Sequence, residues 1–266
     1  MTFPAIMSKL GFGTWRLYGD ECRDSVVDAL AMGYRHLDTA RRYDNEEAVG
    51  RGLALSDVPR HEIFLSTKLD LDCPASEVLV QTRDSLEKLQ TDYLDLLLMH
   101  WANTQIPTRD TLEGMMRVRD KGLVRHIGVA NFTTRLLAET ATEFPIVANQ
   151  IEYHPYLSQT ALLAAAERYG HAIVAYSPVA RGRILDDTVI AEIARQHGKT
   201  PAQVTLRWCI QQERVCAIPK SASHERRAEN MDVFDFELSD DEMGALHGLA
   251  DGYRIVSPPH APDWDR

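Results

Sequence analysis

Four side chains in the N-terminal part of the chain could together deliver a proton to an oxygen atom. They are Asp38, Tyr43, Lys68 and His100. Tyrosine has an ordinary pKa of about 10 and is a slow acid at neutral pH, but a nearby ammonium favours the phenolate and lowers that pKa. Asp38 could hold the ammonium of Lys68 in place, and His100 could orient a carbonyl oxygen. If the four side chains converge, they form a proton-donating site.

Such a site would reduce a carbonyl only with a hydride donor, which no side chain can be, and nicotinamide is the commonest cofactor of this kind. The fingerprint G-x-G-x-x-G is absent, because segment 11–16 lacks the third glycine. Lys220 and Ser221, with Arg226 on a following helix, offer another phosphate site at a helix N-terminus. The alternative interpretation is a solvated helix start that binds nothing.

The elements that would position these residues are short apolar runs separated by helical patterns. Most runs are continuously apolar, which is typical of parallel strands buried on both faces. The eight runs are Leu10–Thr14, Arg35–Ala40, Phe64–Lys68, Leu94–His100, His126–Asn131, Val147–Ile151, Ala172–Ser177 and Val215–Lys220.

Segments with spaced apolar residues and intervening charges predict helices. These are Asp24–Met32, Glu46–Leu55, Ser76–Gln90, Thr111–Lys121, Thr133–Thr142, Ser158–Tyr169, Thr188–His197, Pro201–Gln212 and Ser239–Leu249. Ser76 is a candidate N-cap, Gly122 and Gly170 mark helix ends, and Ser239 with Glu242 forms a capping-box pattern.

Eight strands that alternate with helices in one undivided chain favour a single-domain α/β fold, a (β/α)8 TIM barrel over residues 1–266. A doubly wound open sheet is the alternative. Reactive groups of such barrels lie at the carboxyl ends of the strands. The polar or aromatic residues at those positions include Asp38, Lys68, His100, Trp101, Asn131, Gln150, Tyr176, Ser177, Lys220 and Ser221.

Composition excludes several classes of protein. The 266 residues carry 29 basic and 39 acidic side chains, a net charge of −10, which argues against a nucleic-acid partner. The four scattered cysteines fit neither a disulfide scaffold nor a zinc ribbon and suit a reducing cytoplasm. We expect no signal peptide and no membrane span. We also expect no metal, since His36 and Asp38 lack a matching histidine cluster.

Several ordered motifs resemble the aldo-keto reductase family over nearly the whole chain. They are Gly33–Ala40 with Tyr43, Asn45–Gly50, Ser66–Lys68, Met99–Trp101, and Ile218–Ser221 followed by Arg226, Glu229 and Asn230. The compact length and the tail at 256–265 resemble the bacterial 2,5-diketo-D-gluconate reductase branch, especially its B type.

The resemblance implies a monomer with NADPH (NADP+) extended across the C-terminal face of the barrel, and the scattered cysteines predict that it is cytoplasmic. It gives Asp38, Tyr43, Lys68 and His100 the catalytic roles described above, and it places Trp15, Tyr43, His100 and Trp101 at the substrate. The implied cofactor residues are Gly13, Thr14, Trp15 and Asp38 near the nicotinamide, Asn131 and Gln150 at its carboxamide, Tyr176 on its ring, Ser177, Val179 and Arg181 along the pyrophosphate, and Lys220, Ser221, Arg226, Glu229 and Asn230 at the 2′-phosphate and adenine.

Some residues have a second interpretation. Trp101 could line the substrate pocket or pack under the next helix, and the tail carrying Trp264 could fold over the mouth or simply cover the barrel. Arg41 and Arg42 predict a solvated loop, which could also attract an acidic substrate. His154 is expected to be a hydrogen-bonded structural histidine.

The leading hypothesis is an NADPH-dependent oxidoreductase that reduces small aldehydes, α-dicarbonyls such as methylglyoxal, or keto sugar acids. One alternative is a lyase in which Lys68 forms a Schiff base. Another is a non-catalytic protein that senses a cofactor or binds a partner on the same scaffold.

Overall fold

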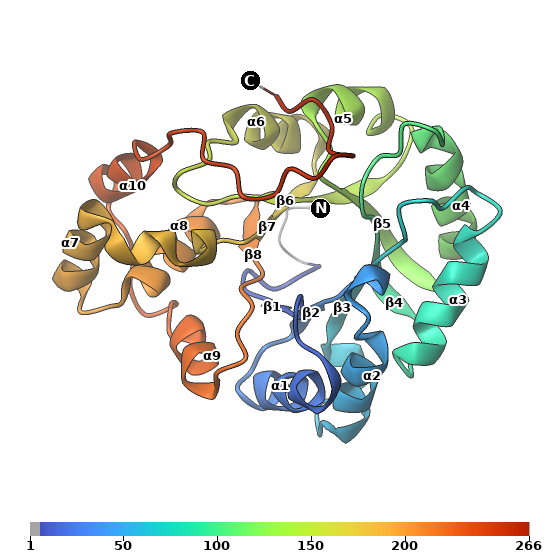
Figure 1. Cartoon of the computed structure of the whole chain (residues 1–266), viewed down its shortest axis with the longest axis horizontal. Helices are drawn as coiled ribbons and strands as arrows, with labels where there is room; N and C mark the ends of the chain where they lie inside the picture. The colour runs from blue at the N-terminus through green and yellow to red at the C-terminus, as the bar shows by residue number, and fades with distance from the viewer. Residues whose placement is uncertain (1–5, 266) are drawn as a thin grey trace.

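The computed structural model describes residues 6–265, within which eight parallel strands form one curled sheet (Figure 1). Their order in the sheet follows the sequence, from β1 to β8. A parallel bridge between Leu10 and Ala217 joins the two edges, so the sheet closes into a barrel. The strands are β1 (Phe12–Gly13), β2 (His36–Asp38), β3 (Phe64–Lys68), β4 (Leu94–Met99), β5 (Val124–Ala130), β6 (Ile146–Glu152), β7 (Ala172–Tyr176) and β8 (Val215–Ala217).

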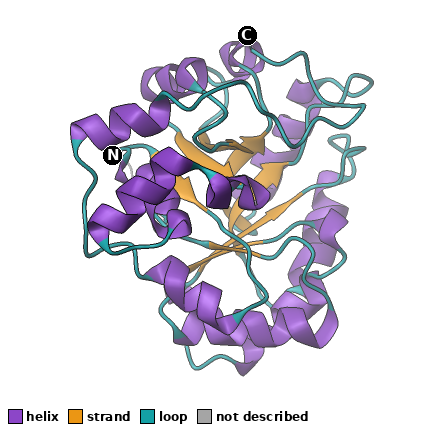
Figure 2. Ribbon diagram, turned by 60° about the vertical axis from the view of Figure 1, so that its left-hand side comes forward, coloured by secondary structure: helices purple, strands orange, loops and turns teal. Residues whose placement is uncertain are grey.

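Helices surround the barrel, as the view coloured by secondary structure shows (Figure 2). None of the helices within residues 6–265 combines the length and apolar character needed to cross a membrane. The helices are α1 (Gly19–Ala31), α2 (Glu46–Leu55), α3 (Val78–Lys88), α4 (Thr108–Asp120), α5 (Thr134–Thr140), α6 (Thr160–Tyr169), α7 (Thr188–His197), α8 (Pro201–Gln211), α9 (His224–Met231) and α10 (Asp240–His247).

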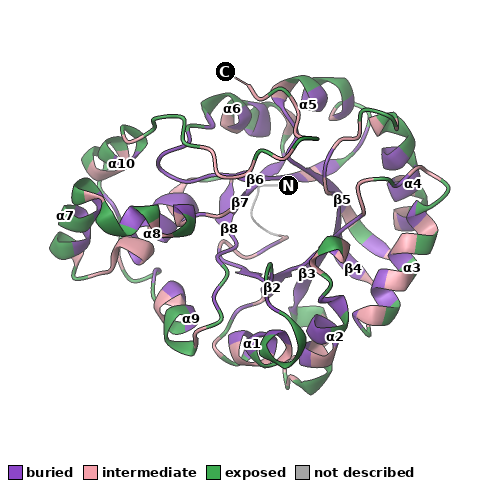
Figure 3. Ribbon diagram, viewed as in Figure 1, coloured by how far each residue is buried: buried purple, intermediate pink, exposed green. Residues whose placement is uncertain are grey.

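Strand residues pack on both sides of the sheet, which explains the continuous apolar runs. In β4, Leu96 and Leu98 belong to the cluster that also contains Val174 of β7, inside the barrel. Their neighbours Leu97 and Met99 belong to the larger cluster that the helices cover. Figure 3 accordingly shows buried strands and helices whose outer faces are exposed.

The predicted elements correspond closely to the observed ones, and three have the predicted bounds: Phe64–Lys68, Glu46–Leu55 and Thr188–His197. The helix ends at Gly122 and Gly170 are confirmed by φ values of 76° and 77°. The remaining bounds differ by a few residues.

The capping predictions had opposite outcomes. The capping box of Ser239 and Glu242 is confirmed. Ser76 as an N-cap is wrong, because a turn closed by the hydrogen bond from Glu77 N to Pro74 O precedes the helix, which begins at Val78.

Gly50 provides a test of the packing between α2 and the end of α3. A Cβ at this position would lie 2.2 Å from the carbonyl oxygen of Lys88. We expect Gly50→Ala to lower the free energy of unfolding by about 1–3 kcal/mol, because backbone must move to admit the methyl group.

Gly244→Ala is the matched control, since no atom lies within 4 Å of its added Cβ in α10. This variant should gain about 0.5–1 kcal/mol from reduced backbone freedom. Urea unfolding measures both changes, and equal midpoints for the two variants would contradict the packing described.

Candidate active site

A cavity of about 580 Å³ opens at the carboxyl ends of the strands. Its wall combines strand ends, the loops that follow them and part of the C-terminal tail. Thirteen predicted site residues line it: Gly13, Trp15, Asp38, Tyr43, His100, Trp101, Asn131, Gln150, Tyr176, Ser177, Val179, Arg181 and Lys220. The structure thus brings together most of the residues that the sequence singled out.

A buried ion pair lies at the base of this cavity. Lys68 Nζ is 2.6 Å from Asp38 Oδ2, and the two side chains are 1% and 2% exposed. Lys68 also donates to Thr39 O at 2.8 Å, while Asp38 Oδ1 accepts from Ser66 Oγ at 2.9 Å and from Gln150 Nε2 at 2.7 Å. Burial is the largest single influence and lowers the pKa of Lys68, but Asp38, followed by Tyr43, opposes it and the combined effect raises that pKa. Lys68 is therefore a fixed ammonium.

Tyr43 stands above this ion pair on a short 3-10 helix, Arg41–Tyr43. Lys68 Nζ lies 4.8 Å from the centroid of its ring, and the ring of His100 packs edge-on at 6.0 Å between centroids. Burial raises the pKa of Tyr43, and the ammonium of Lys68 opposes that rise without reversing it. The expected lowering of the tyrosine pKa is therefore wrong, because burial has the larger effect. Tyr43 holds its proton at neutral pH.

His100, directly after β4, is a neutral imidazole. Burial, followed by the charge of Lys68, lowers its pKa well below the ordinary value. Its Nδ1 is buried without a hydrogen-bond partner among residues 6–265. The carbonyl oxygen of His100 accepts from Asn131 Nδ2 at 3.1 Å. A neutral imidazole beside Tyr43 can donate one hydrogen bond to an oxygen without supplying charge.

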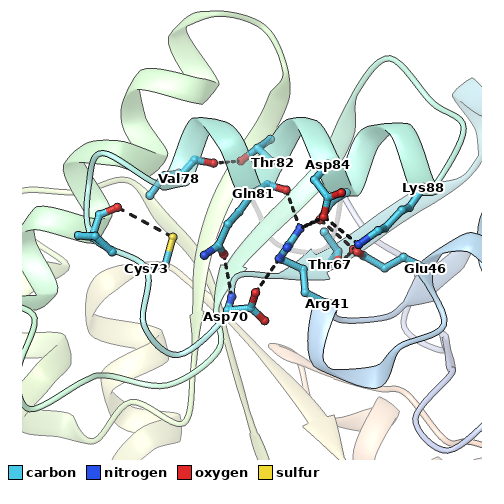
Figure 4. A network of polar contacts seen from close by, with 12 residues as sticks. Arg41, Glu46, Thr67, Asp70, Cys73, Val78, Gln81, Thr82, Asp84 and Lys88 are labelled. Carbon is cyan, nitrogen blue, oxygen red and sulfur yellow. Dashed lines mark hydrogen bonds and ion pairs between the residues drawn. The ribbon is translucent and has the colours of Figure 1, made fainter.

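Arg41 anchors the loop that carries Tyr43 (Figure 4). Its guanidinium donates to Asp70 Oδ2 at 2.9 Å, to Asp84 Oδ2 at 2.6 Å and to Gln81 O at 2.9 Å. The solvated loop predicted for the two arginines is wrong for Arg41, because acceptors on α3 and after β3 bind its side chain. The anchor fixes the backbone next to the phenol.

Asn45 connects two of the loops around the mouth. It accepts from Thr39 Oγ1 at 2.7 Å and donates to Thr14 O at 2.9 Å and Leu17 O at 3.0 Å. Thr14 is fully buried and donates its hydroxyl to Asp38 O at 3.0 Å. Thr14, which the resemblance assigns to the cofactor, does not line the cavity, and its hydroxyl holds the backbone of Asp38.

Two of the side chains predicted to bind the nicotinamide are joined by a hydrogen bond. Tyr176 donates its hydroxyl to Asn131 Oδ1 at 2.8 Å, and both side chains line the cavity. Asn131 and Ser177, which follow β5 and β7, adopt φ values of 62° and 51°. Positive φ at two strand ends is uncommon for residues other than glycine and often marks a functional site.

The residues predicted for the 2′-phosphate and adenine extend from the loop before α9 to the last turn of α9. Lys220 and Arg226 are exposed, and among residues 6–265 neither forms an ion pair. Ser221 is instead turned to Ser223, whose amide donates to Ser221 Oγ at 3.1 Å. Glu229 accepts from the Thr200 hydroxyl at 2.6 Å. Of the predicted site residues, Thr14, Lys68, Ser221, Arg226, Glu229 and Asn230 do not line the cavity.

The C-terminal tail forms part of the cavity wall and is held by Glu152, which the sequence analysis missed. This fully buried carboxylate accepts from Ile255 N at 2.6 Å and Val256 N at 2.7 Å, and it lies 2.9 Å from His154 Nε2. Val256, Pro258 and His260 consequently line the cavity. His154 is a hydrogen-bonded structural residue, as expected.

Trp101 is buried and lines the cavity, in line with the first of its two interpretations. Its ring packs edge-on against His260 and Trp264 of the tail, with centroids 5.2 and 5.9 Å away. The tail therefore folds over the mouth instead of merely covering the barrel.

Glu152→Gln tests the attachment of the tail. The change keeps the side-chain size but removes the charge that two backbone amides share, and such charge-assisted bonds are worth about 1.5–3 kcal/mol. We expect trypsin to cleave after Arg254 roughly tenfold faster or more, measured by mass spectrometry. The exposed Glu225→Gln is the control. Equal cleavage in both variants would show that other contacts hold the tail.

Residues 9–251 match the sequence profile of the Aldo/keto reductase family. The chain is 39% identical over 272 residues to methylglyoxal reductase DkgB of Escherichia coli O157:H7, covering 100% of both chains. It is 42% identical to a crystal structure provisionally described as 2,5-diketo-D-gluconic acid reductase B, with a TM-score of 0.95 and coverage of 98% and 94% of the two chains.

A Bombyx mori aldo-keto reductase crystallised in complex with NADP is 34% identical, with a TM-score of 0.88 over 96% of this chain and 93% of that one. Both the sequence match and the structural likeness extend through the barrel and its mouth. The chain belongs to the aldo/keto reductase family and is an oxidoreductase that acts on carbonyl groups.

Proposed function

We propose that the enzyme reduces small aldehydes, α-dicarbonyls or keto sugar acids with NADPH, and that Tyr43 donates the proton. One arrangement carries the proposal: the Tyr43 ring lies 4.8 Å from the buried ammonium of Lys68 and packs edge-on against the neutral ring of His100, and Tyr43 and His100 line the same cavity. The relatives named for methylglyoxal and for 2,5-diketo-D-gluconic acid support these substrate classes.

The residues around the cavity fit a nicotinamide dinucleotide phosphate. The amides of Asn131 and Gln150 and the ring of Tyr176 face one cavity, as a carboxamide and an aromatic ring would require. Lys220 and Arg226 have no carboxylate partner among residues 6–265, so their charges are available to a phosphate. When bound, the nicotinamide would supply the hydride that a carbonyl carbon accepts.

Side chains of the protein can supply the proton that the carbonyl oxygen receives. Tyr43 keeps its proton in the resting site and can donate it to a carbonyl oxygen as negative charge develops there. The ammonium of Lys68 then stabilises the phenolate, and Asp38 keeps that ammonium within reach. His100 can donate a hydrogen bond that orients the same oxygen.

The Schiff-base alternative is not favoured by the site. Lys68 is 1% exposed, does not line the cavity and is paired with Asp38. Its raised pKa keeps the amine protonated, although a nucleophilic amine must be neutral. The non-catalytic alternative does not account for a complete proton-donating set at the mouth.

Tyr43→Phe tests the proton donor. Because the variant keeps the ring but removes the only proposed acid, kcat/KM should fall by about 10²–10⁴-fold. The Kd for NADPH, followed by tryptophan fluorescence, should remain close to that of the parent enzyme. Turnover near the parent rate would rule out Tyr43 as the acid.

Arg226→Gln tests the phosphate site. Loss of a charge-assisted contact should weaken NADPH binding about tenfold or more while NADH binding changes little, because NADH lacks the 2′-phosphate. Exposed Arg195 on α7 provides the control variant Arg195→Gln. Calorimetric titration gives the dissociation constants of the parent enzyme and of both variants for each cofactor. An equal loss for both cofactors would place Arg226 elsewhere than at the 2′-phosphate.

A further inference from the structure

Arg42 is a cavity-lining cation without a structural partner. It is exposed, lies next to Tyr43 in the chain, and among residues 6–265 its side chain forms neither an ion pair nor a hydrogen bond. The adjacent Arg41 is instead bound by Asp70 and Asp84. Folding therefore uses one arginine of the pair and leaves the other guanidinium free at the mouth, where its five N–H groups can bind an anion in bidentate fashion.

His260 brings a second nitrogen-bearing side chain to the same end of the cavity. The tail held by Glu152 carries it, and its ring packs edge-on against Trp101 at 5.2 Å. Burial lowers the pKa of His260 and the charge of Arg42 lowers it further, whereas Asp72 acts in the opposite direction. Arg42 also contributes to the low pKa of His100, so its charge acts on both imidazoles.

The cavity has no other charge that would satisfy Arg42. Among the lining residues within 6–265, Asp38 is the one carboxylate, and Lys68 neutralises it at 2.6 Å. Of the other lining cations, Arg181 lies over the ring of Trp15 at 4.9 Å, and Lys220 follows β8 beside the proposed cofactor groups. Among the cations that line the cavity within the described residues, Arg42 is thus the one nearest in sequence to Tyr43.

We propose that Arg42, with His260 beside it, forms a carboxylate-binding subsite, so that the preferred substrates are carbonyl compounds carrying a carboxylate remote from the reacting carbonyl. This proposal rests on the proposed function and narrows its substrate class. The guanidinium fork would fix the carboxylate while the carbonyl oxygen meets Tyr43 and His100. A neutral α-dicarbonyl lacks that second attachment point.

The test compares two substrates of nearly the same shape, para-carboxybenzaldehyde and the neutral para-nitrobenzaldehyde. In Arg42→Gln, the ratio of kcat/KM for the acid to kcat/KM for the nitro compound should fall roughly tenfold or more. This fall should come from a higher KM for the acid. Arg42→Lys, which keeps the charge without the fork, should recover part of the ratio. Succinic semialdehyde and butanal provide a second pair.

Arg195→Gln, which removes the same charge from α7 outside the cavity, should leave the ratio unchanged. An equal effect of Arg42→Gln on both members of each pair, or none on either, would overturn the subsite. This result differs from a failure of the proposed function, in which the parent enzyme would oxidise NADPH with neither the acids nor the neutral aldehydes.

Discussion

The buried ion pair of Asp38 and Lys68 constrains the carboxyl end of the barrel. A buried charge is tolerated only when each of its polar atoms has a partner, and removing one partner is strongly destabilising. Here the partners come from separate strands, since Ser66 lies on β3 and Gln150 on β6. The strands must therefore keep their register for the pair to be satisfied. The same register places the ammonium 4.8 Å from the ring of Tyr43.

Strands supply the buried pair of Asp38 and Lys68, whereas Tyr43 lies on a short turn and loops and the tail supply most of the cavity wall. Two charged residues outside the reaction fasten those loops: Arg41 holds the turn that carries Tyr43, and Glu152 holds the tail that carries His260. Such a division allows the wall to vary in sequence while the proton-donating groups stay fixed. The proposed carboxylate subsite belongs to this variable wall, since Arg42 and the tail residue His260 form it.

The barrel could be predicted from the sequence because burial on both faces makes strands such as Phe64–Lys68 continuously apolar. Most of the predicted site residues line one cavity, because the polar residues that interrupt those runs at strand ends meet at the same end of the barrel. The role of Glu152 in holding the tail could not be predicted, since the amides that it binds lie 103 and 104 residues further along the chain. The pKa direction of Tyr43 was also inaccessible, because it depends on whether burial or Lys68 has the larger effect in three dimensions.

In this account, the buried pair of Asp38 and Lys68 enables Tyr43 to donate a proton. The most direct test compares the rates of NADPH oxidation by the parent enzyme and by Lys68→Met, with methylglyoxal and para-nitrobenzaldehyde as substrates. The account predicts rapid loss of NADPH absorbance with the parent enzyme. It predicts a loss of turnover of about 10²-fold or more in a variant that still binds NADPH, because the phenolate of Tyr43 would lose its counter-charge. Turnover by Lys68→Met at the parent rate would contradict the account.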